Sequence, residues 1–527
     1  MRFKASRIAA LSREPRFLLR TVLWILGCGI VIAFGIGLWR ETREAHNLAK
    51  DPLDLVRKFL QIEPVTGRHD SWKLLESVRS ARQNQKAGAD VDGSELIAGS
   101  TKYLRSDELA LFGIYRAKML FPAGLDSGDL ESFATAAYAE PASGFIGSMY
   151  GDLLRTAGKY EEALAAYERG ATDTGAGADS CRRALDICRR RGWNDKLRAL
   201  YRQPGWQDAV LENVSRDGDE ARKVIIAAGD WLGLLRVSVH DALQRLHSPQ
   251  WIVMAAMTGA LWFLVIHVGA CVPVRQWWRG LLGFACGLLS VPLTYFLISV
   301  QETFLGGSDL NHGLDDLVYC ISGVGLREEL AKLLLFAPLL VLLRKAPASH
   351  VLAVAASTGL GFAVLENVGY FNDLSVSSVW ARFISANFLH FALTGLAGLA
   401  LWQTVRNPGK WMQHFTIVFV GAVIFHGLWD WSPSDPRFAG DYRFVVLAGF
   451  IWLAYYFFGE LLRYSQPAPG VPSAVFVYLA GGAVMLSVLL GLTTWELGFR
   501  LAFAATFQPV LTLFAIGAAM YFQLRRA

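Results

Sequence analysis

The segment from Leu317 to Leu343 is apolar and long enough to cross a bilayer, yet it holds four charged side chains near its middle. A charged side chain at the centre of a spanning helix costs roughly 2.5–3.5 kcal/mol even on lenient insertion scales. Charges kept at such a depth usually face other helices or a water-filled space, and they mark function. The segment therefore constrains the chain to a membrane bundle with a polar interior. Its charged residues are Arg327, Glu328, Glu329 and Lys332.

The composition is that of a membrane protein with an additional polar part. Of the 527 residues, 53% are hydrophobic and only 18% are charged, whereas soluble domains are about a quarter charged. The formal net charge is +6, and the basic residues gather beside apolar runs, as they do when they set membrane topology. We therefore expect the bilayer, and no nucleic acid, as a partner.

Runs of about 20 apolar residues predict ten membrane-spanning helices. Most basic residues of the short connections lie on the side of the N-terminus, which predicts cytoplasmic N- and C-termini. Arg382, Arg437, Arg443 and Arg500 are exceptions to this pattern. The expected fold is an all-α, polytopic bundle of about ten spans. The spans are 21–39, 251–274, 280–300, 317–343, 350–372, 382–405, 412–431, 443–463, 472–495 and 501–522.

Residues 1–39 are expected to form a cytoplasmic tail and a signal-anchor helix. A basic N-terminus precedes an apolar run of about 18 residues, which is longer than the 7–15 residues usual in a signal peptide. A cleaved signal peptide remains the alternative, because the triplet Ala33-Phe34-Gly35 resembles a cleavage site.

Residues 40–245 follow the first span and are expected to form an extracytoplasmic helical domain inserted before the membrane domain, 250–527. A 34-residue period aligns Gly158 with Gly192 and resembles that of tetratricopeptide (TPR) repeats, in which small and aromatic residues pack between helices. Fewer than three copies are clear, so an ordinary helical bundle is the alternative. A TPR-like domain would offer a surface to a protein partner.

The six cysteines predict neither a disulfide framework nor a zinc ribbon. Four of them lie in apolar runs. Cys181 and Cys188 are two helical turns apart, about 10 Å, which exceeds the roughly 7 Å that a disulfide bridges.

Four successive spans contribute polar side chains at helical spacing. Glu328 and Lys332 lie one turn apart on one helix face, and so do His426 and Asp430. With the predicted topology and a rise of 1.5 Å per residue, Glu328 lies about 16 Å below the outer membrane edge. His390 lies about 12 Å and His426 about 8 Å below it. The polar set therefore levels in the outer half of the membrane. Its further members are Glu329, Glu366, Asn367, Tyr370, Asn387 and Thr394.

These residue types are suited to hydrolysis. A carboxylate in an apolar setting can take a proton from water, and histidines can stabilise an oxyanion or bind a metal. His390, His426 and Glu366 are candidate ligands for zinc, which favours three protein ligands and an open position. The His-Glu-x-x-His helix of many zinc proteases is absent. Zinc and a purely carboxylate mechanism both remain open.

The order and spacing of these groups resemble the PrsW-type intramembrane proteases, relatives of the CAAX-prenyl protease and bacteriocin-processing group. The resemblance covers about 315–432. It rests on Glu-Glu-x-x-Lys at 328–332, Glu-Asn at 366–367, His390, and His-x-x-x-Asp at 426–430. Ala386 departs from the wider group, which often has phenylalanine four residues before the histidine.

The resemblance implies cleavage of a membrane-anchored protein, such as an anti-sigma factor, on the extracytoplasmic side of a bacterial inner membrane. It implies that Glu328 is the general base and that Glu329 supports it. Of the two, we expect Glu329 to be partly replaceable. His390 and His426 would orient water or stabilise the oxyanion, Glu366 would belong to the site, and Asp430 would tune His426.

Simpler interpretations exist for each group. Arg327 or Lys332 can neutralise a glutamate for structural reasons, Glu366 can join helices, and Asp430 can be a solvated helix end. A transporter or channel with an intramembrane Glu/His relay is the alternative function, and the inverted repeats typical of many transporters are not evident. A catalytically inactive scaffold is a third hypothesis.

Overall fold

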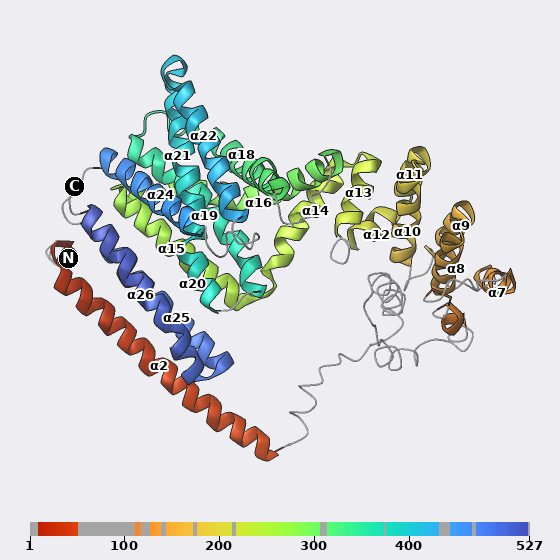
Figure 1. The fold of residues 1–527 in the computed structure, drawn as a ribbon, viewed down its shortest axis with the longest axis horizontal. Coiled ribbons are helices and arrows are strands. Elements are labelled where there is room, and N and C mark those ends of the chain that lie inside the picture. Colours follow the sequence, from red (N-terminus) through yellow and green to blue (C-terminus); the bar gives the residue numbers. More distant parts are fainter. Residues whose placement is uncertain are drawn as a thin grey trace. The chain divides into compact units, whose positions relative to one another are not determined.

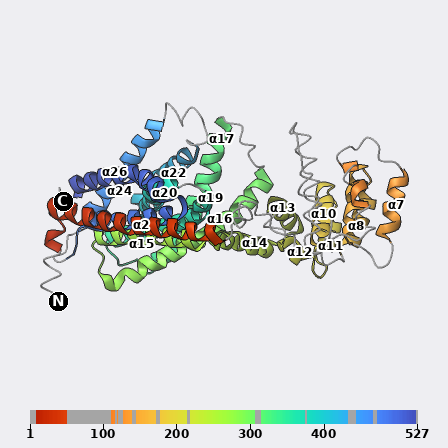
Figure 2. The ribbon, with the colours of Figure 1, turned by 90° about the horizontal axis from the view of Figure 1, so that it is seen from below.

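The computed structural model comprises two compact units, one of residues Arg57–Val237 and one of Met1–Val56 together with Ser238–Ala527. All regular elements among the described residues are helices (Figure 1, Figure 2). Arg437 and much of 40–110, about which the sequence makes predictions, lie outside these described residues. The described ranges are 9–50, 111–115, 118–119, 127–138, 144–171, 177–212, 218–305, 314–373, 376–431, 443–465 and 471–524.

Eight of the described helices are long and apolar enough to cross a membrane. They coincide with eight of the ten predicted spans, so the chain is a multi-pass membrane protein. The spans are Pro15–Arg40, Pro249–Gly269, Val274–Phe304, Ala348–Phe371, Arg382–Arg406, Pro408–Trp431, Ala474–Trp495 and Phe499–Phe522. Two predicted spans remain. One is 443–463, which is helical and forms α24 (Arg443–Tyr464). The other is the charged segment, 317–343.

The charged segment is a helix of changing pitch. A π-helix, η6 (Tyr319–Gly325), leads into α18 (Leu326–Phe336), and the 3₁₀-helix η7 (Ala337–Leu340) follows. Gly325 packs so closely on α22 (Pro408–Trp431) that a Cβ there would lie 2.5 Å from the carbonyl oxygen of Val423. π-Turns are rare and occur frequently at functional sites. Here the π-helix ends at Gly325, and the two glutamates follow in the first turn of α18.

Helix α19 lies at the centre of the membrane unit and packs against α15, α16, α18 and α21. Glycines allow this approach. A Cβ on Gly359 of α19 would collide with the backbone carbonyl of His390 on α21, and one on Gly361 would collide with that of Phe284 on α16. The helices are α15 (Pro249–Gly269), α16 (Trp277–Leu305), α17 (Leu314–Val318), α19 (Ala348–Asp373), α20 (Val376–Ile384), α21 (Ala386–Arg406) and α22 (Pro408–Trp431).

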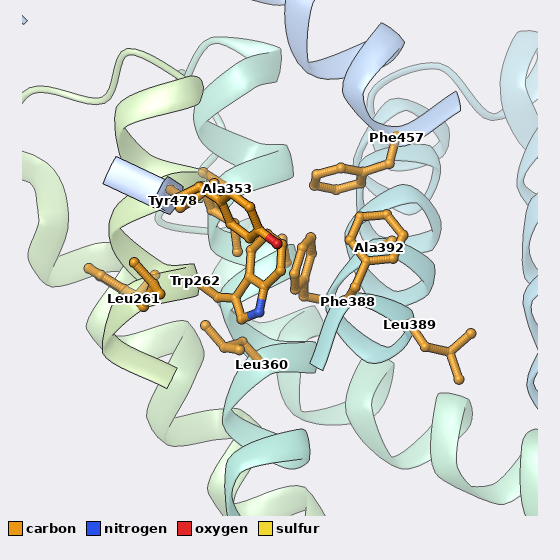
Figure 3. Close-up of a cluster of buried hydrophobic side chains, with 14 of the residues drawn as sticks. Leu261, Trp262, Ala353, Leu360, Phe388, Leu389, Ala392, Phe457 and Tyr478 are labelled. Atoms are coloured by element: carbon orange, nitrogen blue, oxygen red, sulfur yellow. The ribbon is translucent and has the colours of Figure 1, made fainter. Parts of the chain in front are cut away.

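An aromatic core surrounds Trp262 of α15 (Figure 3). Its indole lies 4.9 Å from the ring of Phe391 and 5.5 Å from that of Tyr478, measured between centroids. The indole N–H donates to the carbonyl of Phe383 at 2.8 Å. This buried donor is thus satisfied, and α15 is fixed to the segment that leads into α21.

Helix α2 (Pro15–Lys50) lies along α25 (Ala474–Leu497), which also packs on α26 (Phe499–Leu524) (Figure 1). Ser473 bonds to Ser12 at one end, through Oγ to carbonyl at 2.7 Å, and Arg40 donates to the carbonyl of Thr494 at the other, at 3.4 Å. The first and ninth predicted spans therefore run parallel.

The other unit contains helical hairpins with one repeated turn. Gly158, Gly192 and Gly229 all have positive φ, near +75° (+79°, +71° and +77°). After each, a backbone N–H bonds five residues back, from Lys159 to Leu154 (2.9 Å), from Trp193 to Cys188 (2.8 Å) and from Asp230 to Ile225 (3.1 Å). This is the Schellman helix ending. The helices are α7 (Ser127–Ala137), α8 (Gly144–Thr156), α9 (Tyr160–Gly170), α10 (Gly177–Arg190), α11 (Asn194–Tyr201), α12 (Trp206–Glu212), α13 (Gly218–Ala228) and the first half of α14 (Trp231–Gln244).

The six cysteines are free. Cys181 and Cys188 are buried in α10, and burial raises the pKa of Cys181 to about 12 and that of Cys188 to about 11. Both thiols are therefore protonated and inert in the folded unit.

Candidate active site

Side chains from α18, α19, α20, α21 and α22 meet in one polar cluster inside the membrane unit. Every residue that the sequence nominated for catalysis belongs to it. The polar cluster consists of Glu328, Glu329, Lys332, Glu366, Asn367, Arg382, Asn387, His390, Thr394, His426 and Asp430.

Glu329 is fully buried, and three donors hold its carboxylate. Lys332 Nζ and His426 Nδ1 both lie 2.8 Å from its Oε1. The Thr394 hydroxyl donates to Oε2 at 3.1 Å. A buried carboxylate needs such partners, because an unpaired charge in this setting is strongly unfavourable. Glu329 is therefore an anchor between α18, α21 and α22.

Glu328 has looser contacts and is the more accessible of the two glutamates. Its side chain is 12% exposed, against 0% for Glu329. Its Oε2 lies 3.5 Å from Lys332 Nζ and 3.4 Å from His426 Nε2. Both distances are longer than a strong charge-assisted hydrogen bond, so this carboxylate keeps the capacity to bind another group.

His426 is oriented by the anchor. Because Nδ1 lies on the Glu329 carboxylate, that nitrogen carries the proton, and Nε2 faces the two looser carboxylates. Asp430 Oδ2, one turn along α22, lies 3.4 Å from Nε2. The Asp430 side chain is 36% exposed, so the imidazole has a buried and a more open side.

The side chain of Lys332, with its terminal ammonium group, is fully buried. Besides Glu329 and Glu328, its Nζ lies 2.9 Å from His390 Nδ1. It also lies 4.0 Å from the centroid of the Phe362 ring, a cation–π distance. Since an ammonium group has three hydrogens to donate, the three polar neighbours account for all of them.

His390 is engaged on both sides of its ring. The Lys332 ammonium group can only donate hydrogen bonds, so His390 Nδ1 is the acceptor of the bond between them. The ring hydrogen therefore lies on Nε2, which donates to Glu366 Oε2 at 2.9 Å. Glu366 in turn accepts from Arg382 at 3.2 Å. Arg382 stacks on Tyr370, with its guanidinium carbon 3.6 Å from the ring centroid.

Arg327 does not neutralise the glutamates. Its guanidinium donates to Gln301 Oε1 of α16 at 3.0 Å and lies 5.7 Å from the centroid of the Tyr319 ring. Of the two cations that the sequence offered as partners of the glutamates, Lys332 fills that position.

Among the described residues, Glu328, His390 and His426 form a group that could hold a metal ion, with ligand atoms within 4.8 Å of one another. Two imidazoles and a carboxylate suit zinc. Glu366, which the sequence proposed as a ligand, supports His390 in the manner of a carboxylate behind a metal-bound histidine. However, the lone pair of His390 already accepts from Lys332. A metal ion and this ammonium group therefore compete for the same imidazole.

Sequence reasoning did not assign roles to Arg382, Thr394 or Asn387. Arg382 was an exception to the positive-inside pattern, and an arginine that defies topology beside a polar span is the signal that could have identified it. Thr394 and Asn387 share a helical stripe with His390, three to four residues apart, but threonine and asparagine are common in such helices as simple helix-joining groups.

Comparison with known families gives one match, and it covers the region of this cluster. Residues 275–457 match the family described as PrsW family intramembrane metalloprotease. Neither a curated protein nor a solved structure is significantly similar to the chain. The matched region includes α18 to α22 and thus the whole polar cluster. The part of the chain that holds the polar cluster is therefore similar to the PrsW family of intramembrane metalloproteases.

Proposed function

We propose that the chain is an intramembrane endopeptidase that hydrolyses one peptide bond of a membrane-anchored protein, with Glu328 as the general base. One observation carries this assignment: of two adjacent glutamates, one is locked by three donors and the other is left loosely bound beside His426 Nε2. A structural ion-pair cluster has no need of a loosely held carboxylate.

In the proposed reaction, Glu328 takes a proton from a water molecule, and the water oxygen attacks the carbonyl carbon of the scissile bond. The carbon–nitrogen bond then breaks, and the proton passes from Glu328 to the leaving amine. His426 Nε2, 3.4 Å from Glu328, orients the water. Glu329 keeps that imidazole in one tautomer.

His390 takes a positioning role in this scheme, because Lys332 and Glu366 occupy both of its ring nitrogens. This differs from the role expected from the resemblance, in which His390 orients water or stabilises the oxyanion. Asp430 lies at the more exposed side of His426 and polarises it.

A bound zinc ion would supply Lewis acidity and lower the pKa of a coordinated water, and Glu328, His390 and His426 would hold it. That arrangement requires Lys332 to release His390. We therefore propose the carboxylate mechanism. Undiminished cleavage after dialysis against a chelator is the expected result, whereas loss that zinc restores would assign the metal mechanism.

The substrate class follows from the depth of the site in a membrane unit. A single-pass protein, such as an anti-sigma factor, would present its scissile bond near the extracytoplasmic side of a bacterial inner membrane. The parallel course of α2 and α25 supports a topology with both termini on one side of the membrane, because the first and ninth spans then cross in the same direction, and the basic connections favour the cytoplasmic side. The TPR-like helical unit would present or screen substrates on the outer side.

The proposal is tested by co-expressing the chain with a panel of epitope-tagged single-pass membrane proteins and following their fragments. We expect cleavage by the wild type and no cleavage by Glu328→Gln or His426→Ala. Glu460→Gln, a carboxylate of α24 that pairs with Arg463, is the matched control and should cleave normally. Undiminished cleavage by both site variants would overturn the assignment.

A further inference from the structure

Asn387 is a fully buried residue of the polar cluster, and it has no role in the reaction proposed above. It lies on α21 three residues before His390, about 4.5 Å along the helix axis at 1.5 Å per residue. It therefore shares the stripe that also directs His390 and Thr394 into the cluster.

The orientation of its amide is fixed by a relay that starts at an arginine. Arg382 can only donate, so Asn367 Oδ1 must be the atom that accepts from Arg382 Nε, at 2.6 Å. Asn367 Nδ2 then donates to Asn387 Oδ1 at 2.8 Å. The amino group of Asn387 consequently points away from Asn367, and no ambiguity of amide assignment remains.

That amino group is a buried donor with no hydrogen-bond acceptor among the described residues. Leaving a buried donor unsatisfied is unfavourable by about 1–3 kcal/mol, and such groups in a folded protein call for an explanation. Accepting from Asn367 uses only the Oδ1 atom of Asn387 and does not account for its amino group. The donor is therefore better explained by a ligand that it meets during function.

The donors of Lys332 and Thr394 and the Nδ1 hydrogen of His426 are committed. Lys332 donates to Glu328, Glu329 and His390, Thr394 donates to Glu329, and His426 Nδ1 lies on Glu329. A hydrolytic site needs at least one donor aimed at the oxygen on which negative charge develops. In this cluster the amide of Asn387 has that capacity.

We propose that Asn387 is a catalytic residue that donates from Nδ2 to the carbonyl oxygen of the scissile bond. The inference rests on the proposed hydrolytic function. As the water oxygen bonds to the carbonyl carbon, the π electron pair moves to that oxygen and Asn387 stabilises the resulting oxyanion. Collapse restores the C=O bond and releases the amine, which takes its proton from Glu328. Removing one such donor typically lowers kcat about 10²–10³-fold.

The test compares Asn387→Ala with Asn387→Asp in purified full-length protein, using the single-pass reporter that the wild type cleaves most. The aspartate retains an acceptor for Asn367 but has no amino group. An oxyanion donor predicts that both variants lose about 10²–10³-fold in kcat, with KM within about threefold of the wild type. Asn407→Ala and Asn407→Asp, at the exposed end of α21, are matched controls and should behave as wild type.

A merely structural role for Asn387 predicts the opposite ordering, with Asn387→Asp restoring the activity that Asn387→Ala loses. That result, or a kcat within threefold of the wild type in either variant, overturns the inference. A second readout separates folding from chemistry: a reporter with a thioamide at the scissile bond binds an oxyanion donor weakly, so the loss caused by Asn387→Ala should shrink at least tenfold with it. A loss of the same size with both reporters would contradict the proposal.

Failure of the inference is distinguishable from failure of the function. If the wild type cleaves the reporter and Glu328→Gln does not, the proposed function stands, and the two Asn387 variants alone decide the role of the amide. If Glu328→Gln cleaves like the wild type, the hydrolytic function and the inference fall together.

Discussion

Glu328 and Glu329 are adjacent in the sequence, yet their surroundings are opposite. Glu329 is enclosed by Lys332, Thr394 and His426, while Glu328 retains some exposure and only long contacts. The sequence suggested that Glu329 would be partly replaceable. The structure argues against this, because its removal would leave a buried ammonium group and an imidazole N–H without their shared partner.

The first prediction separates the two carboxylates. We expect Glu328→Gln to lower cleavage by at least about 100-fold, as for loss of a general base, with an unchanged melting temperature. Glu329→Gln should lower both cleavage and the melting temperature, since breaking a buried ion pair costs about 3–5 kcal/mol. Thermal melting of the purified variants, measured beside reporter cleavage, gives the answer. Equal melting temperatures for the two variants would show that Glu329 is not an anchor.

The second prediction concerns the competition at His390. In Lys332→Met the lone pair of His390 Nδ1 is released, so we expect this variant to bind zinc and to melt at a higher temperature when zinc is added. The wild type should show little response, because its ammonium group occupies the imidazole. Lys332→Met/His390→Ala is the control, with no response expected. A strong zinc response of the wild type would show that the metal displaces Lys332.

At the residue level, the sequence was sufficient to find the polar cluster apart from Arg382. Charged and imidazole side chains in apolar spans are rare enough to be noticed singly, and helical spacing pairs those on one face. It could not show that Lys332 bonds to His390 or that Arg382 reaches Glu366. Both contacts join different helices, and they depend on packing distances that a period along one helix does not contain.

At the scale of elements, hydropathy located eight spans, because length and apolar composition decide which helices a bilayer accepts. It did not predict the π-helix η6 within the charged segment. At the end of that element Gly325 packs closely on α22, a tertiary contact that the hydropathy of one segment does not contain. The sequence therefore predicted a single α-helical span for this segment, and it did not predict the change from π-helix to α-helix to 3₁₀-helix.

The third prediction tests the contact between α19 and α21. In Gly359→Ala the new methyl group would meet the carbonyl of His390, pushing α21 and its imidazole away from Lys332. We expect a loss of about 1–3 kcal/mol in stability, as for overpacking, and a clear loss of cleavage. Gly421→Ala on α22 is the control, since nothing lies within 4 Å of its Cβ position. Similar melting and cleavage of the two variants would contradict this packing account.

At the scale of the whole molecule, the chain consists of a membrane unit and a helical unit with three similar turns. The period of 34 residues detected the turns at Gly158 and Gly192. It missed Gly229, because this glycine comes 37 residues after Gly192 and its helices lack the same small and aromatic positions. Positive φ at the three glycines and the shared hydrogen bond reveal the repetition. We propose that this unit binds the substrate.

The fourth prediction concerns the stability of the helical unit at low pH. Burial raises the pKa of Asp186, but hydrogen bonds from Arg190 and Arg189 lower this pKa by more than burial raises it. The net shift of the pKa is therefore downward. A folded pKa below the unfolded value of about 3.9 stabilises the unit above that pH, and this stability is lost as the pH falls through the folded value.

We therefore expect Asp186→Asn to destabilise the helical unit at pH 7, with the difference from the wild type shrinking toward pH 3. Labelling of the buried thiols Cys181 and Cys188 by a disulfide reagent that remains reactive in acid would report opening of the unit in the full-length protein. A difference between variant and wild type that stays constant from pH 7 to pH 3 would exclude this linkage.

The central claim, that Glu328 directs water at a peptide bond within the membrane, is tested most directly by cleavage in ¹⁸O-labelled water. Purified wild type and Glu328→Gln would be reconstituted with a cleaved single-pass reporter, and the new C-terminal carboxyl group would be examined by mass spectrometry. If Glu328 is the general base, the wild-type product carries one ¹⁸O atom and Glu328→Gln forms almost no product. Equal amounts of labelled product from both proteins would contradict it.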